Sequence, residues 1–245
     1  MKKLIILFIL LLTLPCYAQD LARLNVGVVG GGVAAVAGCT TPATHTYDQG
    51  FEAAFPITGW TVSNMTSGET LTGTPPAASC TKGMLMADQT IATAYYDASG
   101  FAGQTHYFRI DFNLATEAFG NWGGLSFMNV GESTTPGSLK AAGFIFEHQG
   151  TGVIYLNYAG AATVTLINDV VAGTWYRITG LIDSATPTNS WIKVNGGSAI
   201  EFDPYDGLNL YYWHFGDLDG SQAVGNHCSI QYGYFAINNS EISSD

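Results

Sequence analysis

Strict alternation of apolar and polar side chains is the feature that most limits the folds open to this chain. Within residues 175–183, Tyr176 and Ile178 point to one face of an extended segment. Arg177 and Thr179 point to the other face. A period of two indicates a β-strand, because successive side chains of a strand project to opposite faces. No segment shows a 3.6-residue period over ten residues, so we expect little helix.

A second strand and a tight turn follow this segment. The run Ser-Ala-Thr-Pro-Thr-Asn at 184–189 is typical of a polar loop. Alternation then resumes, with Ile192 and Val194 on one face and Trp191 and Lys193 on the other. Asn-Gly comes next, at 195–196, and is a strong short signal for a hairpin turn.

The clearest alternation in the chain runs from His106 to Leu114. It predicts a strand with one face in a core and one face in contact with water. We expect Phe108, Ile110 and Phe112 to point inward and Arg109, Asp111 and Asn113 to point outward.

Many further short runs of the same kind predict an all-β protein. Gly-containing turns separate them, and no internal repeat is visible. This spacing predicts a two-sheet antiparallel β-sandwich or jelly roll, in which the first and last strands are neighbours. The other predicted strands are 47–55, 59–62, 82–87, 90–96, 125–130, 142–148, 153–158, 163–168, 208–215 and 229–237, with a loop at 66–79.

The Trp-Tyr-Arg strand at 175–177, the Asp-bearing loop and the Val-Asn-Gly at 194–196 carry a family resemblance. Together with the aromatic strands that follow, they resemble the concanavalin A-like lectin/glucanase superfamily, particularly its laminin G-like and pentraxin-like members. The resemblance implies a concanavalin A-like jelly roll. It does not imply one function, because this fold hosts lectins, hydrolases, adhesins and spacers.

The first 18 residues have the pattern of a secretory signal peptide. Lys2 and Lys3 precede an apolar run, and Cys16-Tyr17-Ala18 places small residues suitably for cleavage after Ala18. We therefore expect a secreted or cell-surface protein. An uncleaved anchor is the alternative, although the apolar run is short for a membrane span.

After cleavage the chain is strongly acidic. The signal peptide removes two of the eight basic residues and no acid, which leaves six against 19 and a net charge of −13. Such a surface disfavours nucleic acid and anionic membranes as partners. Charged residues make up only 11% of the sequence, which suits an extracellular β protein. The mature 227 residues are enough for one large sandwich.

Residues 19–46 form a Gly/Val-rich leader and linker, and we place the sandwich domain at 47–245. A flexible leader is one explanation of this composition. The second is self-assembly through residues 20–46, because apolar runs of low charge can add to a sheet edge. A dinucleotide-binding loop is excluded, since Gly30-Gly31-Gly32 lacks the later glycine and the flanking helix.

The mature chain has three cysteines, Cys39, Cys80 and Cys228. Export favours one disulfide with one cysteine left over. We expect Cys80 to bond with either Cys39 or Cys228. No CxxC motif or close histidine pair accompanies them, so a zinc site is not indicated.

The most enzyme-like feature is Glu201-Phe202-Asp203. Laminarinase-type hydrolases of the resembled superfamily carry Glu-x-Asp-x-x-Glu on a strand, with carboxylates facing one cleft. Glu201 and Asp203 match the first two positions, but Asp206 stands in place of the Glu and Pro204 interrupts the strand. A solvated acidic turn is the alternative. The five histidines are scattered and suggest no triad or metal site.

Calcium is the ion best suited to the acidic loop near the C-terminus. Asp217 and Asp219, followed by Gly220, offer two carboxylates on a turn. The loop lacks the later Glu of an EF-hand, and a simple Asp-Gly turn is the alternative.

Carbohydrate binding needs aromatic rings for the apolar faces of sugars, with carboxylates and amides for the hydroxyls. The aromatic candidates are Trp122, Trp191, Tyr211 and Trp213, and the polar candidates are Arg109, Asp111, Asn113 and Glu147.

These observations lead to three functional hypotheses. The first is an exported, non-catalytic module that binds a glycan or cell-surface polysaccharide, or mediates adhesion. The second is a structural or assembly component of a cell surface, appendage or virion. The third is a laminarinase-like hydrolase using Glu201 and Asp203.

Overall fold

A computed structural model of the chain describes residues 47–72, 80–87, 92–101, 103–118, 123–136, 138–148, 154–159, 163–218 and 227–242. In these ranges the protein consists of strands and one short 3-10 helix, η2 (Pro187–Asn189). None of the described segments is a helix long and apolar enough to cross a membrane. The predicted signal peptide and leader lie outside these ranges and stay predictions.

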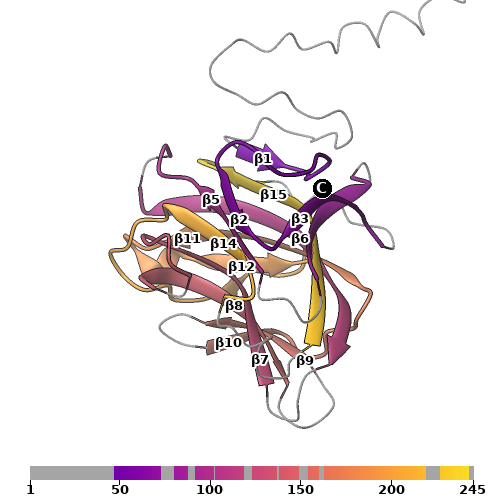
Figure 1. The fold of residues 1–245 in the computed structure, drawn as a ribbon. Coiled ribbons are helices and arrows are strands. Elements are labelled where there is room, and N and C mark those ends of the chain that lie inside the picture. The colour runs from indigo at the N-terminus through magenta and orange to yellow at the C-terminus, as the bar shows by residue number, and fades with distance from the viewer. Residues whose placement is uncertain are drawn as a thin grey trace, which may run out of the picture. The chain divides into compact units, whose positions relative to one another are not determined.

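The strands form two antiparallel sheets, as the alternation predicts (Figure 1). Sheet A has the order β13 (Ile200–Glu201), β12 (Trp191–Val194), β11 (Trp175–Asp183), β6 (Thr105–Ala118), β15 (His227–Asn238), β4 (Lys82–Met86) and β3 (Thr66–Thr70), and β1 (Tyr47–Gln49) also pairs with β15. Sheet B has the order β10 (Thr163–Ile167), β9 (Ile154–Ala159), β8 (Lys140–His148), β7 (Gly123–Gly131), β14 (Tyr212–Gly216), β5 (Thr93–Asp97) and β2 (Trp60–Ser63).

Most predicted strands are present, and the first and last ones are neighbours as expected. β1 runs beside β15, with Tyr47 opposite Ile237. Two predictions were wrong. The segment predicted as a loop at 66–79 begins with strand β3, and the first strand ends at Gln49 rather than at residue 55. The short β13 was also missed.

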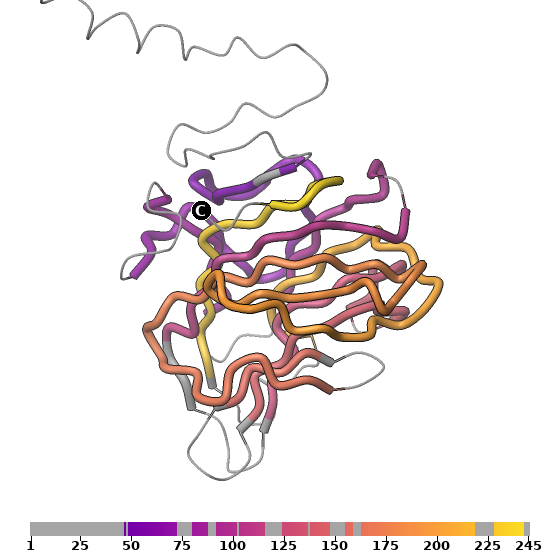
Figure 2. The backbone as a smooth tube through the Cα atoms, turned by 180° about the vertical axis from the view of Figure 1, so that it is seen from behind, coloured from indigo at the N-terminus to yellow at the C-terminus, as the bar shows by residue number. Residues whose placement is uncertain are grey.

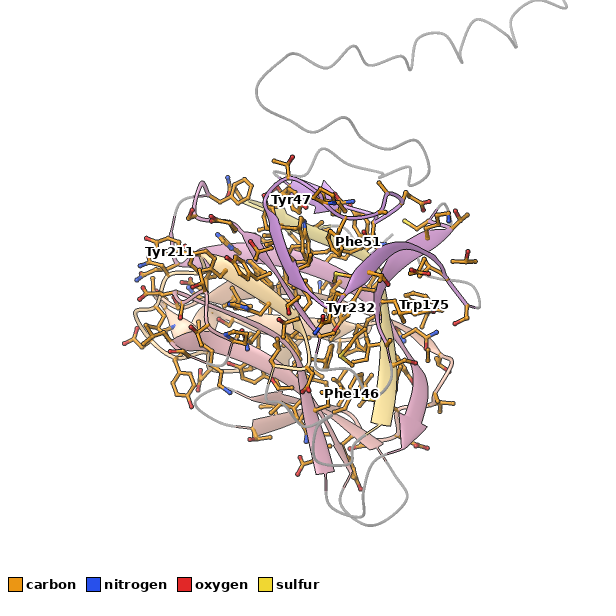
Figure 3. All side chains as sticks on the ribbon, in the orientation of Figure 1. Tyr47, Phe51, Phe146, Trp175, Tyr211 and Tyr232 are labelled. Carbon is orange, nitrogen blue, oxygen red and sulfur yellow. The ribbon has the colours of Figure 1, made fainter. Side chains whose placement is uncertain are left out.

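The core lies between the sheets and is rich in aromatic rings. Phe112 of sheet A contacts Phe127 of sheet B, with ring centroids 5.1 Å apart. Phe127 in turn stacks on Phe146 at 4.4 Å. These side chains are fully buried, and Phe146 lies well inside the layer of side chains in Figure 3. Dense contact of this kind is what alternating strands of two sheets produce when their apolar faces meet.

Tyr232 joins the two sheets through a buried hydroxyl group. Its ring belongs to β15 of sheet A, and its hydroxyl donates to the Phe127 carbonyl of β7 at 2.9 Å. The same oxygen accepts a hydrogen bond from the Gly216 amide of β14 at 3.1 Å. A β-bulge between Ser126 and Met128 interrupts the regular ladder at Phe127, so this carbonyl can be bonded by a side chain. Burial raises the pKa of the Tyr232 hydroxyl, which keeps it protonated.

The Asn-Gly turn follows β12 as predicted. Asn195 and Gly196 have φ angles of 49° and 71°, which are the positive values that a type I′ turn needs at both central positions. The Gly197 amide closes the turn on the Val194 carbonyl at 2.9 Å. The antiparallel pairs β7–β8, β8–β9 and β9–β10 of sheet B, and then β11–β12 of sheet A, can be followed along the tube in Figure 2.

The fold excludes one of the two predicted disulfides. Cys228 is a core residue of β15, opposite Glu117 of β6. Cys80 packs in a separate cluster with Tyr234 and Ala236 of the same strand. Six or more residues of β15 therefore separate the two sites, or about 20 Å at the rise of a strand. A disulfide joins Cα atoms no more than about 7 Å apart, so Cys80 cannot bond with Cys228.

A non-reducing peptide map of the mature protein tests the remaining pairing. We expect a peptide that links Cys80 to Cys39, the other cysteine left in the mature chain, with Cys228 recovered unlinked to Cys80. A linked pair of peptides containing Cys80 and Cys228 would show that the strand register is incorrect.

His106 is a polar residue in the core. It is fully buried, its ring stacks on Trp213 at 6.2 Å, and neither ring nitrogen has a hydrogen-bond partner in the described part of the chain. Burial lowers the pKa of His106 to about 4, because the core disfavours the charged imidazolium. The imidazole is therefore neutral in the folded protein at pH 7.

This histidine predicts a loss of stability in mild acid. The unfolded chain binds the proton near pH 6.5, and the folded chain only near pH 4. The contribution of His106 to stability is therefore fully present above pH 6.5, and it is lost as the pH falls from 6.5 towards 4. From pH 7 to pH 5 we expect His106 to contribute a loss of about 2 kcal/mol in the free energy of unfolding.

The measurement is urea denaturation of the wild type and of His106→Phe at both pH values. The variant keeps a flat ring. Between pH 7 and pH 5 its free energy of unfolding should fall by about 2 kcal/mol less than that of the wild type. His106→Leu serves as a second variant if Phe is too large. An identical pH dependence in wild type and variants would disprove the assignment.

Candidate functional site

The polar candidates on β6 point away from the core, as predicted, but they do not form a wet surface. Arg109, Asp111 and Asn113 project from the outer face of sheet A and are 2%, 0% and 0% exposed. The prediction that this face of the strand contacts water is therefore wrong. Local alternation indicates the face of the strand to which a side chain points. It does not indicate whether another part of the chain covers that face.

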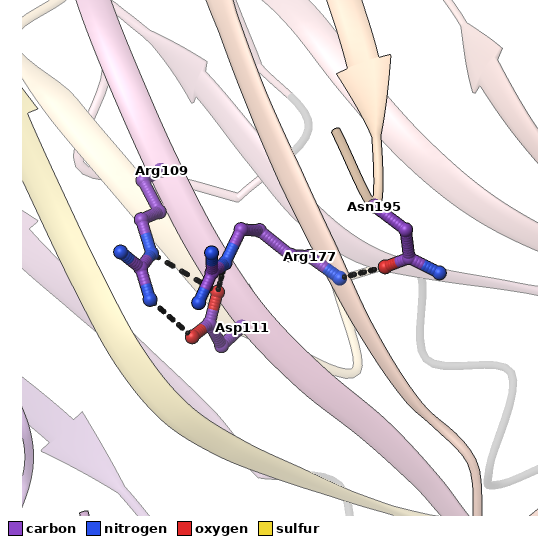
Figure 4. A network of polar contacts seen from close by, with 4 residues as sticks. All are labelled: Arg109, Asp111, Arg177 and Asn195. Atoms are coloured by element: carbon purple, nitrogen blue, oxygen red, sulfur yellow. Dashed lines mark hydrogen bonds and ion pairs between the residues drawn. The ribbon is translucent and has the colours of Figure 1, made fainter. Parts of the chain in front are cut away.

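Arg109, Asp111 and Arg177 form a buried ion cluster on this outer face (Figure 4). Arg109 donates to both carboxylate oxygens of Asp111, from Nε at 3.2 Å and from Nη2 at 2.8 Å. Nε of Arg177, on the paired strand β11, donates to Oδ1 of Asp111 at 3.1 Å. The Arg109 guanidinium also lies 4.7 Å from the centre of the Tyr234 ring.

The chain after β3 covers part of this face. The carbonyl of Thr72 accepts a hydrogen bond from the Trp175 indole at 2.6 Å. The amide and hydroxyl of Thr72 both donate to Oε1 of Gln231, at 3.0 and 2.8 Å. The cluster is thus enclosed and internally paired, which assigns it a structural role rather than that of a ligand site.

Trp191 lies on the same outer face and is half-buried. Lys193 lies on the same side, as predicted, with its ammonium 4.5 Å from the centre of the indole ring. The ammonium also pairs with Glu241 at 3.0 Å. The ring of Tyr107 lies edge-on to the indole, with ring centroids 6.4 Å apart. Part of this aromatic surface is therefore already used within the protein.

Trp213 belongs to the core, so it cannot present its ring to a sugar as the prediction of a glycan-binding residue requires. It is fully buried and packs against Phe108 and Phe235, with centroids 5.3 Å away in both cases. Tyr211 is half-buried just before β14, near the edge of the domain in Figure 3, and its ring contacts Tyr212 at 6.5 Å. Trp122 lies outside the described residues.

The strand arrangement expected for a laminarinase-like site is contradicted. Strand β13 ends at Glu201, so Glu201 and Asp203 are not alternate residues of one strand. Between them Phe202 enters the core and packs on Tyr158 at 4.2 Å. The backbone carbonyl of Asp203 accepts the Tyr158 hydroxyl at 3.1 Å. This segment closes one end of the sandwich.

The calcium prediction receives no test. Asp217 is buried directly after β14, with its amide bonded to the Ala92 carbonyl at 2.8 Å. Asp219 lies outside the described residues. Within the described ranges, no group of three or more His, Cys, Asp or Glu side chains could hold a metal ion.

The opposite surface, the outer face of sheet B, has a different character. Inward residues such as Trp213 and Phe215 leave their strand neighbours pointing outward. The register places outward residues of five strands on this face in two groups, one near Asn129 of β7 and the other in the rows of Gly124 and Ser126. They are Tyr95 of β5, Asn129 of β7, Glu147 of β8, Tyr155 and Asn157 of β9, and Tyr212 and His214 of β14.

Tyrosine rings provide the half-exposed part of this face. Tyr95 meets Tyr212 edge-on, with centroids 5.6 Å apart, and lies 5.4 Å from His214. Tyr155 is also half-buried and lies opposite Glu147. Such rings offer an apolar surface together with a polar hydroxyl.

His214 is held in one tautomer by a backbone carbonyl. Nε2 lies 2.8 Å from the Ser133 carbonyl, which can only accept, so Nε2 carries the proton. His214 is 2% exposed, and burial lowers its pKa although the Ser133 bond acts in the opposite direction. Nδ1 is therefore an acceptor, and it has no partner among the described residues.

Two amides on the same face have unused hydrogen-bonding groups. Asn157 donates to Glu147 at 2.6 Å, but its Oδ1 has no partner within the described ranges. Nδ2 of Asn129 likewise has none. Both side chains are at least 97% buried. A buried polar group without a partner costs about 1–3 kcal/mol, so such groups commonly occur where water or a ligand binds.

Of the predicted glycan residues that the structure describes, Glu147 is the one that lies on this face. The sequence pattern suggested Trp213 as a glycan-binding ring of β14, and the histidines looked scattered. Placing Trp213 and Phe215 in the core would have turned Tyr212 and His214 outward, because neighbours in a strand alternate. That Asn129 and Asn157 lie on the same face of one sheet depends on strand pairing and has no local signal.

Comparisons with known proteins support the fold. No protein-family model and no curated protein matches the sequence. An endo-beta-1,4-glucuronan lyase from the fungus Trichoderma reesei is similar in structure, with a TM-score of 0.51, 14% identity, and coverage of 82% of this chain and 99% of that one. Trypanosoma rangeli sialidase gives a TM-score of 0.51 and 12% identity over 76% of this chain and 28% of its own. At these identities the likeness shows a shared β-sandwich fold.

The ion cluster predicts a large effect of a conservative substitution. Asp111→Asn keeps the shape of the side chain but removes the charge that both arginines contact. We expect a loss of about 3–5 kcal/mol in the free energy of unfolding, because breaking a buried pair leaves charge uncompensated. Glu241→Gln, which breaks the exposed pair with Lys193, should cost at most about 1 kcal/mol. Equal effects of the two variants in denaturant titrations would contradict a buried cluster.

Proposed function

We propose that this protein is an exported, non-catalytic glycan-binding module of the concanavalin A-like superfamily, and that it binds carbohydrate on the outer face of sheet B. The observation that supports this most is the combination on one face of half-exposed tyrosines, amides and a carboxylate. The proposed export rests on the signal-like first 18 residues, and the superfamily assignment rests on the residues around Trp175 and Asn195.

The chemistry of that face suits a sugar. A pyranose ring presents C–H groups on its faces, which pack on aromatic rings, and hydroxyls at its rim, which exchange hydrogen bonds with amides and carboxylates. Tyr95, Tyr155 and Tyr212 supply the rings. Asn129 and Asn157 supply buried groups whose hydrogen bonds are incomplete within the described residues. The outer face of sheet A supports the proposal less, because its charged groups are paired with one another.

The spacing of carboxylates argues for binding rather than glycoside hydrolysis. The carboxylates on the outer face of the described sheet B strands are Glu147 of β8 and Asp97 of β5. Two strands, β7 and β14, lie between them, which is about 14 Å across the sheet at the usual strand spacing. Glu147 is opposite Gly124 of β7, whereas the row of Asp97 and Tyr212 meets β7 at Gly131, so seven residues along the strand separate them further. Glycosidase carboxyl pairs lie about 5 to 9.5 Å apart. Glu147 is also engaged by Asn157, and Asp97 by the Ser99 amide.

Two further properties stay part of the proposal. Calcium at a loop with Asp217 and Asp219 would be compatible with a lectin, and binding is therefore to be measured with and without the ion. Assembly through residues 20–46 remains the alternative function for a surface or appendage component.

Glycan binding and its location are testable together. The mature protein, residues 19–245, is screened on a glycan array with and without calcium. For a glycan that binds, Tyr212→Ala and Tyr95→Ala should each weaken the affinity about tenfold, because each removes a stacking ring worth about 1 kcal/mol or more. Trp191→Ala, on the opposite sheet, is the matched control and should bind as the wild type does.

Circular dichroism and thermal melts must show that all three variants are folded. Loss of binding in Trp191→Ala with unchanged binding in the tyrosine variants would move the site to sheet A. Silence across a broad array from folded protein would favour the assembly function.

A further inference from the structure

We propose that His214 and Asn129 form a subsite for a sugar hydroxyl, and that the glycan bound there is uncharged rather than a uronic acid polymer. This inference rests on the proposed function and specifies its ligand class.

The two side chains are direct cross-strand neighbours. Asn129 of β7 is the register partner of His214 of β14. Side chains in such positions have Cβ atoms about 4.5–5.5 Å apart and lie on the same face. Both project outward, because the residues on either side of each, such as Val130 and Phe215, are core residues.

The pair combines one donor and one acceptor that lack partners. Nδ1 of His214 is an acceptor, since Nε2 donates to Ser133, and Nδ2 of Asn129 is a donor. Neither atom has a hydrogen-bond partner in the described chain, although both residues are 2% exposed. One hydroxyl satisfies both atoms, because its hydrogen donates to Nδ1 and its oxygen accepts from Nδ2.

A carboxylate fits this pair poorly. It has no hydrogen to donate, so beside Nδ1 it would bring one lone pair against another in a buried position. The neutral state of His214, which burial favours, gives no compensating positive charge. The subsite therefore accepts a hydroxyl and disfavours a carboxylate at this position.

The neighbouring position leaves room for a sugar. The residue opposite Asn129 on the next strand, β8, is Gly143. Because glycine has no side chain, no β8 side chain stands beside Asn129 at this position in the row. Tyr95, on the other side of His214, offers a ring for the face of the same sugar.

The charge distribution supports the same ligand class. Among the strands of sheet B, Lys140 is the only lysine or arginine. The two arginines of the described chain, Arg109 and Arg177, belong to the buried cluster on sheet A. The whole chain has a formal net charge of −11, which repels polyanions. A uronate polymer would thus meet an acidic protein with little basic charge at the site.

The test uses the mature chain and two sets of hexasaccharides, measured by calorimetry at physiological salt. The neutral set contains cello-, laminari-, manno- and xylo-oligosaccharides, and the uronate set contains alginate and glucuronan oligosaccharides. We expect measurable affinity for at least one neutral ligand and at least tenfold weaker binding of both uronates. Asn129→Ala should weaken the binding of the neutral ligand about tenfold. Asn238→Ala on sheet A is the control and should leave this binding unchanged.

A thermodynamic cycle identifies the hydroxyl. Monodeoxy derivatives of the neutral ligand are bound to the wild type and to Asn129→Ala. One derivative should bind the wild type about tenfold more weakly than the parent glycan does. It should bind Asn129→Ala with almost the same affinity as the parent glycan, because the variant already lacks the interaction. His214→Phe should give the same pattern, and if it fails to fold, Asn129→Ala carries the test.

The outcomes separate the two proposals. Tighter binding of a uronate than of every neutral ligand overturns the hydroxyl subsite but leaves glycan binding intact. Neutral binding that is unaffected by Asn129→Ala and His214→Phe overturns the subsite assignment. If neither set binds and the array of natural glycans is also silent, the proposed glycan-binding function fails and this inference fails with it.

Discussion

The architecture depends on β6 being buried on both of its faces. Its inward side chains meet sheet B, where Phe112 contacts Phe127. A charged outward side chain that is buried away from water needs a partner. Asp111 is therefore bonded by Arg109 of the same strand and by Arg177 of the adjacent strand β11. The central strand therefore carries an apolar core on one side and an ion cluster on the other. The core contacts and the ion cluster both require the same register of β6 with β11 and β15.

Sheet A and sheet B use polar groups in different ways. On sheet A, the Thr72 segment and the Arg109–Asp111–Arg177 cluster form hydrogen bonds within the protein. On the outer face of sheet A one buried side-chain atom, Oδ1 of Asn113, has no partner among the described residues, whereas on the outer face of sheet B Asn129, Asn157 and His214 each have one such atom. A folded protein rarely leaves buried polar atoms unpaired without a reason. This difference, together with the half-exposed tyrosines, is why we propose the glycan site on sheet B.

Much of the fold was predictable from local patterns. Tyr176 and Ile178 face the core and Arg177 faces away, as alternation indicated, and Asn195-Gly196 forms the expected turn. Errors arose where the pattern did not decide which residues of a strand point to the core. Trp213 and His214 are adjacent, and either can be chosen as the outward residue. The burial of a large indole is more favourable than that of an imidazole, and the structure buries the indole in the core.

The sequence by itself determined the all-β class, the two-sheet arrangement, the acidic charge and most strand positions, because each follows from composition or from a period of two within a short segment. Only the tertiary structure decided which outer face is enclosed and which residues meet on it. Asn129 and His214 are 85 positions apart in the chain and become neighbours through the pairing of β7 with β14. Such long-range register arises from the packing of all strands together, and no local pattern encodes it.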